Sequence, residues 1–316
     1  MLKLKALLLT QGMHGMISQV EGLAKALGLS FRHETVILKK FWNYIPPKVT
    51  PVIDGILEKK FICDSKIIIS CGRKSVIPSI LLKRRFKEKV FNIHIQDPKV
   101  NLENFDSIIC PEHDNLEGKN VIKTKGAIHY LTTEEINRNL NYLKPNQGQK
   151  KIVTFILGGP NKYYNFSIKQ MDQMFAKIKN MFISTKYKLI VIPSYRTPEN
   201  IIKLAFNYFN QDHLVIKERD KKAYLSSLGL ANIIIVTCDS TSMISEAAIT
   251  GKPVYVAQMN HKRSIHRFKK FYELYMDIGI IRYLEDKVEH WTYEGLNEVN
   301  RAALIVKDKM RKNGII

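Results

Sequence analysis

The sequence is short of acidic residues and lacks long apolar runs. Its 316 residues contain 50 Lys and Arg against 29 Asp and Glu, which gives a formal net charge of +21 at pH 7. This excess favours an anionic partner such as a phosphorylated substrate or a membrane surface. Abundant Lys, Ile and Asn are also typical of AT-biased genomes, so drift in composition is an alternative explanation. No apolar stretch approaches the roughly 18 residues that a membrane-spanning helix needs.

Cysteines are few and unpaired along the chain. Cys63, Cys71, Cys110 and Cys238 stand singly, and three of them lie in apolar, strand-like contexts. No C-x-x-C pair suggests a metal, so buried, reduced thiols of a cytosolic protein are expected. The apolar run at residues 6–10 is too short for a signal peptide and predicts the first strand. We therefore expect a cytoplasmic protein, with peripheral contact to the inner face of the membrane as a further expectation.

Residues 233–257 predict a strand, a helix and a second strand. The β-branched run at 233–236 is typical of a buried parallel strand. Asp239, Ser240 and Ser242 supply capping oxygens for a helix that starts near Thr241. Free N–H groups of that helix would lie at the carboxyl edge of the sheet, which suits a phosphate. An ordinary βαβ unit with a capped helix explains the same pattern.

Strands and helices alternate in two series, which is typical of a doubly wound α/β fold. Residues 139–151 predict a linker between the series. We place an N-terminal Rossmann-like acceptor domain at 1–143 and a C-terminal Rossmann-like donor domain at 144–316. Whether the last helix, from about 293 to 311, packs back on the first domain stays open. The predicted strands are 7–10, 35–38, 67–71, 90–95, 107–110, 121–124, 152–157, 188–192, 214–216, 233–236 and 254–257.

A series of motifs, in order along the chain, resembles the mitochondrial-fission Elm-type family. They include Leu8-Leu-Thr-Gln-Gly12, Gly72-Arg73, Gln96-Asp-Pro98, Pro111-Glu-His-Asp114, Gly158-Gly-Pro160, Arg196-Thr-Pro198, Thr237-Cys-Asp-Ser240 and Thr250-Gly-Lys-Pro-Val254. The resemblance covers nearly the whole chain. It implies the GT-B fold, an α/β architecture of two Rossmann-like domains facing across a cleft. Plant members recruit a fission dynamin to mitochondria, and bacterial members look like nucleotide-sugar glycosyltransferases.

The sequence departs from the family at three places. Gln11-Gly12 stands where Asp-Gly is usual, Met16 stands at a position that is often histidine, and Lys222-Ala-Tyr224 replaces Asn-Pro-Tyr. These departures affect the expected catalytic base and part of the expected donor pocket.

A GT-B enzyme binds a nucleotide-diphosphate sugar mainly in its second domain, so the resemblance implies a donor site there. No Asp-x-Asp follows a predicted strand, and we expect neither an essential metal nor a cofactor. The expected roles are backbone approach at the glycines, phosphate contacts at helix starts, and a carboxylate for a sugar hydroxyl. β–α turns and helix caps are the alternatives. The predicted donor-binding residues are Gly158, Gly159, Asn161, Lys162, Ser194, Arg196, Asp239, Ser240, Thr241, Ser242 and Glu246.

An inverting transfer needs a base that deprotonates the acceptor. The candidate catalytic residues all follow predicted strands of the first domain, and the two aspartates are preferred. Each also has a structural explanation; one aspartate, for example, suits a turn before Pro98. The candidate catalytic residues are His14, Asp97, His113 and Asp114. The candidate acceptor-binding residues are Gln11, Gly12, Gln19 and Arg73.

Basic segments provide the remaining signals. Residues 77–86 are apolar on one side and carry Lys83, Arg84 and Arg85, followed by Lys87, which predicts a helix that docks on anionic lipid or presents a solvated face. The run 261–270 predicts a contact to a donor phosphate or an anionic acceptor, or a charged loop. We expect a glycosyltransferase acting on an envelope lipid or polysaccharide precursor. The alternative is a non-catalytic adaptor, and no nucleic-acid partner is expected.

Overall fold

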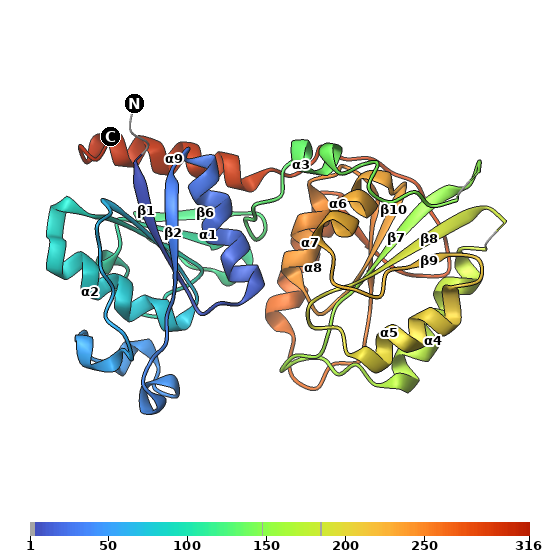
Figure 1. The fold of residues 1–316 in the computed structure, drawn as a ribbon, viewed down its shortest axis with the longest axis horizontal. Coiled ribbons are helices and arrows are strands. Elements are labelled where there is room, and N and C mark those ends of the chain that lie inside the picture. The colour runs from blue at the N-terminus through green and yellow to red at the C-terminus, as the bar shows by residue number, and fades with distance from the viewer. Residues whose placement is uncertain (1–3, 147, 184) are drawn as a thin grey trace. The chain divides into compact units, whose positions relative to one another are not determined.

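The computed structural model describes residues 4–146, 148–183 and 185–316, and it divides the chain into two compact units. Unit 1 comprises Met1–Tyr130 and Asn297–Ile316, and unit 2 comprises Leu131–Leu296. Figure 1 shows that each unit is a parallel sheet covered by helices. The predicted α/β class with two Rossmann-like domains is therefore confirmed.

The sheet of unit 1 has the strand order β2-β1-β3-β4-β5-β6, with every neighbouring pair parallel. Its strands are β1 (Lys5–Thr10), β2 (Ser30–Thr35), β3 (Ile67–Cys71), β4 (Phe91–Ile95), β5 (Ser107–Pro111) and β6 (Val121–Thr124). Five of them coincide closely with predicted strands. The second strand was predicted at 35–38, which is wrong: β2 is an edge strand in which Phe31 is the one apolar residue, while Val36 and Leu38 beyond it are buried in the core.

Helices cover both faces of this sheet. The main helices are α1 (His14–Ala26), α2 (Val76–Phe86) and α9 (Glu298–Lys312). Leu8 and Ile69 pack on the face covered by α1 and α9, while their chain neighbours Leu7 and Ile68 pack on the face covered by α2. Alternate residues of a strand point to opposite faces, so apolar runs without alternation are buried on both sides. Each such side chain contributes roughly 1.5–3 kcal/mol.

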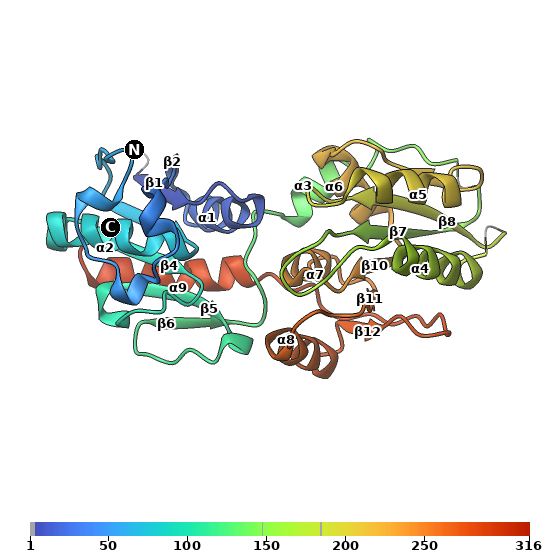
Figure 2. The ribbon, with the colours of Figure 1, turned by 90° about the horizontal axis from the view of Figure 1, so that it is seen from below.

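Unit 1 contains both ends of the chain, as Figures 1 and 2 show. The carboxylate of Glu298 at the start of α9 accepts a hydrogen bond from the backbone N–H of Lys125 at 2.7 Å, and Val306 lies in the same core cluster as the α1 side chains. The last helix thus packs on the first sheet. Residues 131–143 lie in unit 2, on the other side of the boundary from their predicted place. There the hydroxyl of Ser226, in helix α6 (Lys221–Leu230), accepts from the Leu143 N–H and donates to the Leu140 carbonyl.

The sheet of unit 2 has the order β12-β11-β10-β7-β8-β9 and is also parallel. Its strands are β7 (Lys151–Leu157), β8 (Tyr187–Pro193), β9 (Leu214–Val215), β10 (Ile233–Thr237), β11 (Val254–Ala257) and β12 (Ile281–Tyr283). Its helices are α3 (Thr133–Arg138), α4 (Ile168–Met181), α5 (Glu199–Phe209), α6 (Lys221–Leu230), α7 (Thr241–Ala248) and α8 (His266–Asp277). Figure 1 shows α4 and α5 side by side on this unit.

Each sheet has one place where the strand order reverses. In unit 1 the chain goes from β1 to β2 on one side and then to β3 on the other, and in unit 2 it goes from β7 to β8 and later to β10. Loops diverge from such a point at the carboxyl ends of the strands and leave space for a ligand. None of the helices in the described ranges is long and apolar enough to cross a bilayer.

Candidate functional site

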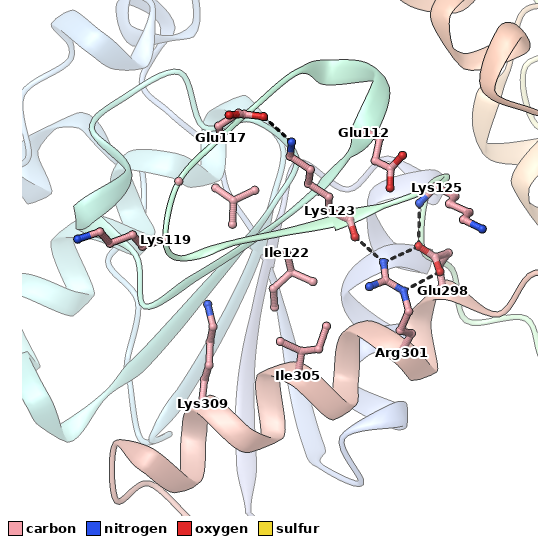
Figure 3. A pocket seen from close by; sticks show the side chains of 12 residues that line it. Glu112, Glu117, Lys119, Ile122, Lys123, Lys125, Glu298, Arg301, Ile305 and Lys309 are labelled. Atoms are coloured by element: carbon pink, nitrogen blue, oxygen red, sulfur yellow. Dashed lines mark hydrogen bonds and ion pairs between the residues drawn. The ribbon is translucent and has the colours of Figure 1, made fainter.

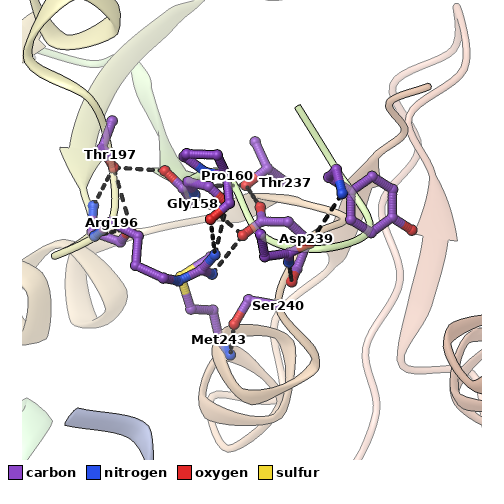
Figure 4. Close-up of polar contacts among 12 residues, drawn as sticks. Gly158, Pro160, Arg196, Thr197, Thr237, Asp239, Ser240 and Met243 are labelled. Carbon is purple, nitrogen blue, oxygen red and sulfur yellow. Dashed lines mark hydrogen bonds and ion pairs between the residues drawn. The ribbon is translucent and has the colours of Figure 1, made fainter. Parts of the chain in front are cut away.

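The loops after β7, β8 and β10 meet at the reversal point of the second sheet (Figure 4). Gly158 and Gly159 follow β7. A Cβ on Gly158 would overlap the carboxylate of Asp239, and one on Gly159 would overlap the carbonyl of Arg196. Glycine is required here because the three loops approach more closely than any side chain allows. The two glycines therefore bring the loops together, and sequence spacing had placed them correctly at a strand end.

Asp239 holds these loops in place. Its buried carboxylate accepts hydrogen bonds from Thr237 Oγ1 at 2.7 Å, from the Gly159 N–H at 3.2 Å and from Arg196 Nη2 at 2.5 Å. Burial raises the pKa of this carboxyl, and the Arg196 charge and these hydrogen bonds act in the opposite direction. With its donors supplied from within the chain, the Asp239 carboxylate positions its neighbours.

Arg196 links the loop after β8 to the loop after β7. Besides Asp239, its guanidinium donates to the carbonyl oxygen of Gly159 at 2.6 Å, and about a third of the side chain is exposed (35%). Ser194 accepts from the Arg196 N–H at 3.3 Å and lies 3.1 Å from the Thr197 hydroxyl. The predicted Ser194 is thus a turn residue, while Arg196 still presents part of its positive charge to solvent.

Asn161 and Lys162 lie in the next part of the β7 loop. The Asn161 side chain donates to the Asp239 carbonyl at 3.0 Å and accepts from the N–H groups of Tyr163 and Tyr164. This closes the turn without an external ligand. Lys162 is exposed, with its ammonium 4.8 Å from the Tyr163 ring centroid.

The predicted basic segment 261–270 reaches this loop. An antiparallel bridge joins Tyr164 to His261, and the Lys262 N–H donates to the Tyr163 carbonyl at 2.7 Å. The side chains of Lys262 and Arg263 are exposed. Three cations, including Lys162, therefore flank the β7 loop on the described surface.

The N-terminus of α7 opens beside this cluster. Ser240 is the N-cap, since its hydroxyl accepts from the Met243 N–H at 3.3 Å. Thr241 and Ser242 are half-buried, and their backbone N–H groups have no acceptor among the residues that the structure describes. The first turn also has no acidic residue. Unpaired N–H groups and the positive end of the helix dipole make this the part of the cluster best suited to an anion.

Glu246 lies on the same helix and is buried. Its carboxylate accepts a hydrogen bond from the Tyr224 hydroxyl of α6 at 2.8 Å. Burial raises the pKa of Glu246 to about 7, and the Tyr224 bond acts in the opposite direction. We did not predict Tyr224 as a site residue, although it occupies the tyrosine position of the altered Lys222-Ala-Tyr224 motif. That motif was the available signal.

The predicted acceptor residues gather at the reversal point of the first sheet. Gln11 and Gly72 are neighbours across β1 and β3, because a Cβ on Gly72 would overlap the Gln11 amide. Gly12 has φ +81°, and its N–H donates to Thr10 Oγ1 at 3.0 Å. Gln19 is buried and donates to the Gly15 carbonyl at 3.1 Å within α1.

Arg73 is bound to its own chain. Its guanidinium donates to the backbone carbonyls of Asn43 and of Ile45, the latter at 3.0 Å. Its observed contacts therefore fix the loop after β2 rather than present a free guanidinium to an acceptor.

The four candidate catalytic residues differ in exposure. His14, at the start of α1, is exposed and lies against the Tyr130 ring with 6.2 Å between centroids. Asp97 accepts from the Lys99 N–H at 2.8 Å and forms an ion pair with that lysine, which is the turn-capping role. His113 is buried with its Nε2 3.8 Å from the Asp114 carboxylate. Among the four, His14 is the most accessible to an acceptor.

The predicted lipid-facing side of residues 77–86 is largely buried. Ile77 and Ile80 of α2 belong to the core below the sheet. Lys83 bonds Asp106 at 2.7 Å, and Arg85 bonds Asp54 at 2.6 Å. Leu81 and Phe86 are half-buried against the same core. The apolar residues that motivated the prediction therefore mainly stabilise the domain.

Unit 1 also has a cavity of about 780 Å³ between β6 and α9 (Figure 3). Its charged groups include two internal pairs, Lys123 with Glu117 at 2.6 Å and Arg301 with Glu298 at 2.7 Å. None of the predicted site residues lines it. No group of three or more potential metal ligands occurs in the described residues.

Comparison with protein families and with known proteins identifies one matching family model and several similar proteins. A family model described as Mitochondrial fission ELM1 matches residues 14–310. Mitochondrial fission protein ELM1 of Arabidopsis thaliana is 26% identical over 279 residues, covering 78% of this chain and 64% of that protein. An uncharacterized protein of Rickettsia prowazekii is 26% identical over 287 residues, covering 78% of this chain and 80% of that protein. The chain thus matches less than two thirds of the plant protein's length.

Solved structures share the fold at low identity. UDP-GlcNAc 2-epimerase of Methanocaldococcus jannaschii, in complex with UDP-GlcNAc and UDP, has a TM-score of 0.54 at 12% identity, covering 96% of this chain and 99% of that one. The enzyme from Neisseria meningitidis, bound to UDP-GlcNAc, has a TM-score of 0.55 at 12% identity, covering 98% and 100%. Os79 from O. sativa, in complex with UDP, gives 0.52 at 12%, covering 98% and 92%. The shared fold is GT-B.

Proposed function

Because the chain belongs to the mitochondrial fission ELM1 family and has the GT-B fold, we propose that it is a nucleotide-sugar-dependent glycosyltransferase. Its acceptor is a cell-envelope lipid or polysaccharide precursor carrying negative charge. The observation that carries the proposal is the N-terminus of α7, where two amides with no acceptor among the described residues open at the reversal point of the second sheet. Structural neighbours with this fold bind UDP or UDP-GlcNAc.

The donor's diphosphate occupies the start of α7. The N–H groups of Thr241 and Ser242 donate to it, and the exposed part of Arg196 lies on the neighbouring loop. Lys162 and the basic segment 261–270 add positive charge at the same sheet edge. Charge-assisted hydrogen bonds of this kind are each worth roughly 1.5–3 kcal/mol. No metal is needed to neutralise the diphosphate in this scheme.

Glu246 binds a hydroxyl of the donor ribose. The carboxylate lies on the same helix as the phosphate-binding amides, and the Tyr224 hydroxyl fixes its orientation. One carboxylate oxygen accepts from Tyr224, which leaves the other oxygen to accept from the sugar.

The transfer itself breaks the bond between the anomeric carbon and the diphosphate oxygen. The acceptor hydroxyl forms the new bond to that carbon, and its proton passes to a base when the reaction inverts configuration. The nucleotide diphosphate leaves with the bonding electrons, and the α7 amides stabilise its developing charge. Of the candidate bases, exposed His14 has the access that this role requires.

The alternative function is a non-catalytic adaptor that recruits a protein partner to a membrane. The relative named Mitochondrial fission protein ELM1 motivates it. An adaptor needs no donor pocket, so nucleotide binding separates the two functions.

A proline substitution tests the donor site with little damage to the fold. Proline is tolerated at the first helical position, and Thr241→Pro removes one amide donor there. Ser240 before it has φ −140° and ψ 101°, a conformation that proline allows in its predecessor. We expect UDP affinity to fall about tenfold, since one charge-assisted hydrogen bond of about 1.5 kcal/mol is lost.

The matched control is Ile168→Pro at the first position of α4, whose N-cap Ser167 is likewise extended. This variant should bind UDP as the unmodified chain does. Thermal shift measures the binding, and release of UDP from UDP-sugars in the presence of membrane extracts measures turnover. Failure of UDP and of other nucleotide diphosphates to stabilise the protein would leave the adaptor as the better explanation.

A further inference from the structure

The segment between β2 and β3 carries an unusual concentration of exposed apolar side chains. Among the described residues, fourteen large apolar side chains are exposed, and six of them fall within residues 37–62. Their exposed fractions lie between 52% and 79%. The six are Ile37, Phe41, Tyr44, Val49, Ile53 and Ile62. The other eight are distributed over the rest of the chain, so this concentration is local.

This segment has a defined structure. Leu38 forms an antiparallel bridge with Leu57, and both side chains are buried in the core on the α2 face of the sheet. The Glu58 N–H donates to the Ile37 carbonyl at 3.1 Å, which closes the segment at its base. Between these ends lie three short 3₁₀ turns. Arg73 donates to the carbonyl of Asn43, the last residue of the first turn, and to the carbonyl of Ile45 just after it. The exposed apolar side chains are therefore presented on an anchored loop.

The same segment is strongly basic. Lys39, Lys40, Lys48, Lys59 and Lys60 are all exposed, and none has an ion-pair partner in the part of the chain that the structure describes. Of its two acidic residues, Asp54 is paired with Arg85 at 2.6 Å, which leaves Glu58. Exposed apolar groups alone would also suit a protein partner, but interspersed unpaired lysines select an anionic surface.

We propose that residues 37–62 form a docking surface for an anionic lipid bilayer. Phe41, Tyr44 and Val49 enter the boundary between headgroups and acyl chains, where aromatic side chains with an apolar body are favoured. The lysines remain among the anionic headgroups, because each contributes an attraction that falls off within a Debye length. Figure 1 shows this blue segment projecting beyond the end of β2.

This surface goes beyond the proposed glycosyl transfer and does not depend on it. It follows β2, at the sheet edge that also carries Gln11, Gly12 and Arg73. A membrane contact here would bring a lipid-linked acceptor to that edge. It replaces helix α2 as the source of membrane attraction, because the apolar residues of α2 are buried or half-buried in the core of unit 1.

Two variants of the full-length protein test the proposal by co-sedimentation with vesicles. One replaces Phe41, Tyr44 and Val49 with Ser, and the other replaces Lys39, Lys40 and Lys48 with Gln. The vesicles contain either phosphatidylcholine alone or equal parts phosphatidylcholine and phosphatidylglycerol. We expect binding to the anionic vesicles only, weaker at about 1 M than at about 0.1 M salt. The lysine variant should lower the partition coefficient about 100-fold, and the apolar variant at least about tenfold.

Matched controls separate this surface from the overall charge of the chain. One control replaces Lys169, Lys203 and Lys307 with Gln, and the other replaces Ile168 and Leu304 with Ser. All five side chains are exposed and lie outside the segment. Both controls should bind as the unmodified chain does. Equal losses in control and test variants, equal binding to neutral and anionic vesicles, or absence of binding would each overturn the proposal. An unchanged melting temperature in the test variants shows that they are folded, whether or not the chain binds UDP, and this keeps the proposed function separate.

Discussion

A substitution of Glu246 can test the effect of its negative charge separately from the effect of its hydrogen bond to Tyr224. Burial raises the pKa of its carboxyl to about 7, against 4.5 in an exposed chain. The unfolded state therefore releases its proton at lower pH than the folded state. Stability contributed by the protonated group is fully present below about pH 4.5 and is lost as the pH rises through about 7. At 1.36 kcal/mol per pKa unit, the loss amounts to roughly 3 kcal/mol.

Glu246→Gln removes this titration and keeps an oxygen that accepts from the Tyr224 hydroxyl. Around pH 4.5 the variant and the unmodified chain should have similar free energies of unfolding. Around pH 8 the variant should be more stable by roughly 3 kcal/mol. Urea unfolding across this range measures the difference, and UDP affinity measured at pH 8 should fall about tenfold if the ionised carboxylate binds the ribose.

Glu298→Gln provides a control of opposite sign. Burial acts upward on the pKa of Glu298, but its bonds from Arg301 and from the Lys125 N–H outweigh burial and hold the pKa below its usual range. Its charge is therefore stabilising. As the pH rises above the acidic range, the unmodified chain should gain stability that the variant lacks, so the variant should be the less stable of the two near neutral pH. A difference between Glu246→Gln and the unmodified chain that stays constant from pH 4.5 to 8 would refute the role assigned to burial.

Two further predictions concern the loops around Asp239. Asp239→Ala should lower the free energy of unfolding by an amount on the order of 3 kcal/mol, since it removes the acceptor of Arg196 Nη2 and of the Thr237 hydroxyl. Urea unfolding measures this loss, and a cost below about 1 kcal/mol would contradict the central role of Asp239. Gly159→Ala should cost about 1–3 kcal/mol because its Cβ overlaps the Arg196 carbonyl, and it should also weaken UDP binding in thermal-shift titrations. An unchanged melting temperature would show that the loops separate easily.

The sequence predicted strands well where both faces are buried. Strands β3 and β10 begin with three and four consecutive apolar side chains, and their positions follow directly from that pattern. The edge strand β2 was misplaced because it is almost entirely polar, with side chains such as Arg32, His33 and Glu34, and so lacks the apolar pattern of a strand. Its position depends on pairing with β1, a contact between Lys5 and Ser30 that local sequence does not reveal.

The candidate site was predictable as a location more than as a set of contacts. Polar residues after strands marked the carboxyl edges of both sheets, and the structure brings the predicted donor residues of unit 2 to one edge. The pairing of Arg196 with Asp239 joins residues far apart in the chain, so neither motif alone indicated it. An apolar helix side has the same residue pattern in the sequence whether it faces lipid or the protein core. The fold shows that the apolar side of α2 packs against the core.

The predicted donor-site residues fall into two groups, according to whether their hydrogen-bond donors and acceptors are already used within the chain. Asp239 and Asn161 have their polar atoms bonded within the chain, and the amides of Gly158 and Gly159 donate to Thr237 and Asp239. Such residues are expected to respond to substitution mainly through stability. Thr241, Ser242 and Glu246 retain donors or acceptors and are expected to respond mainly through nucleotide affinity. A fixed set of loops with an open helix terminus is what preorganised anion binding requires, because the ordering cost is met during folding.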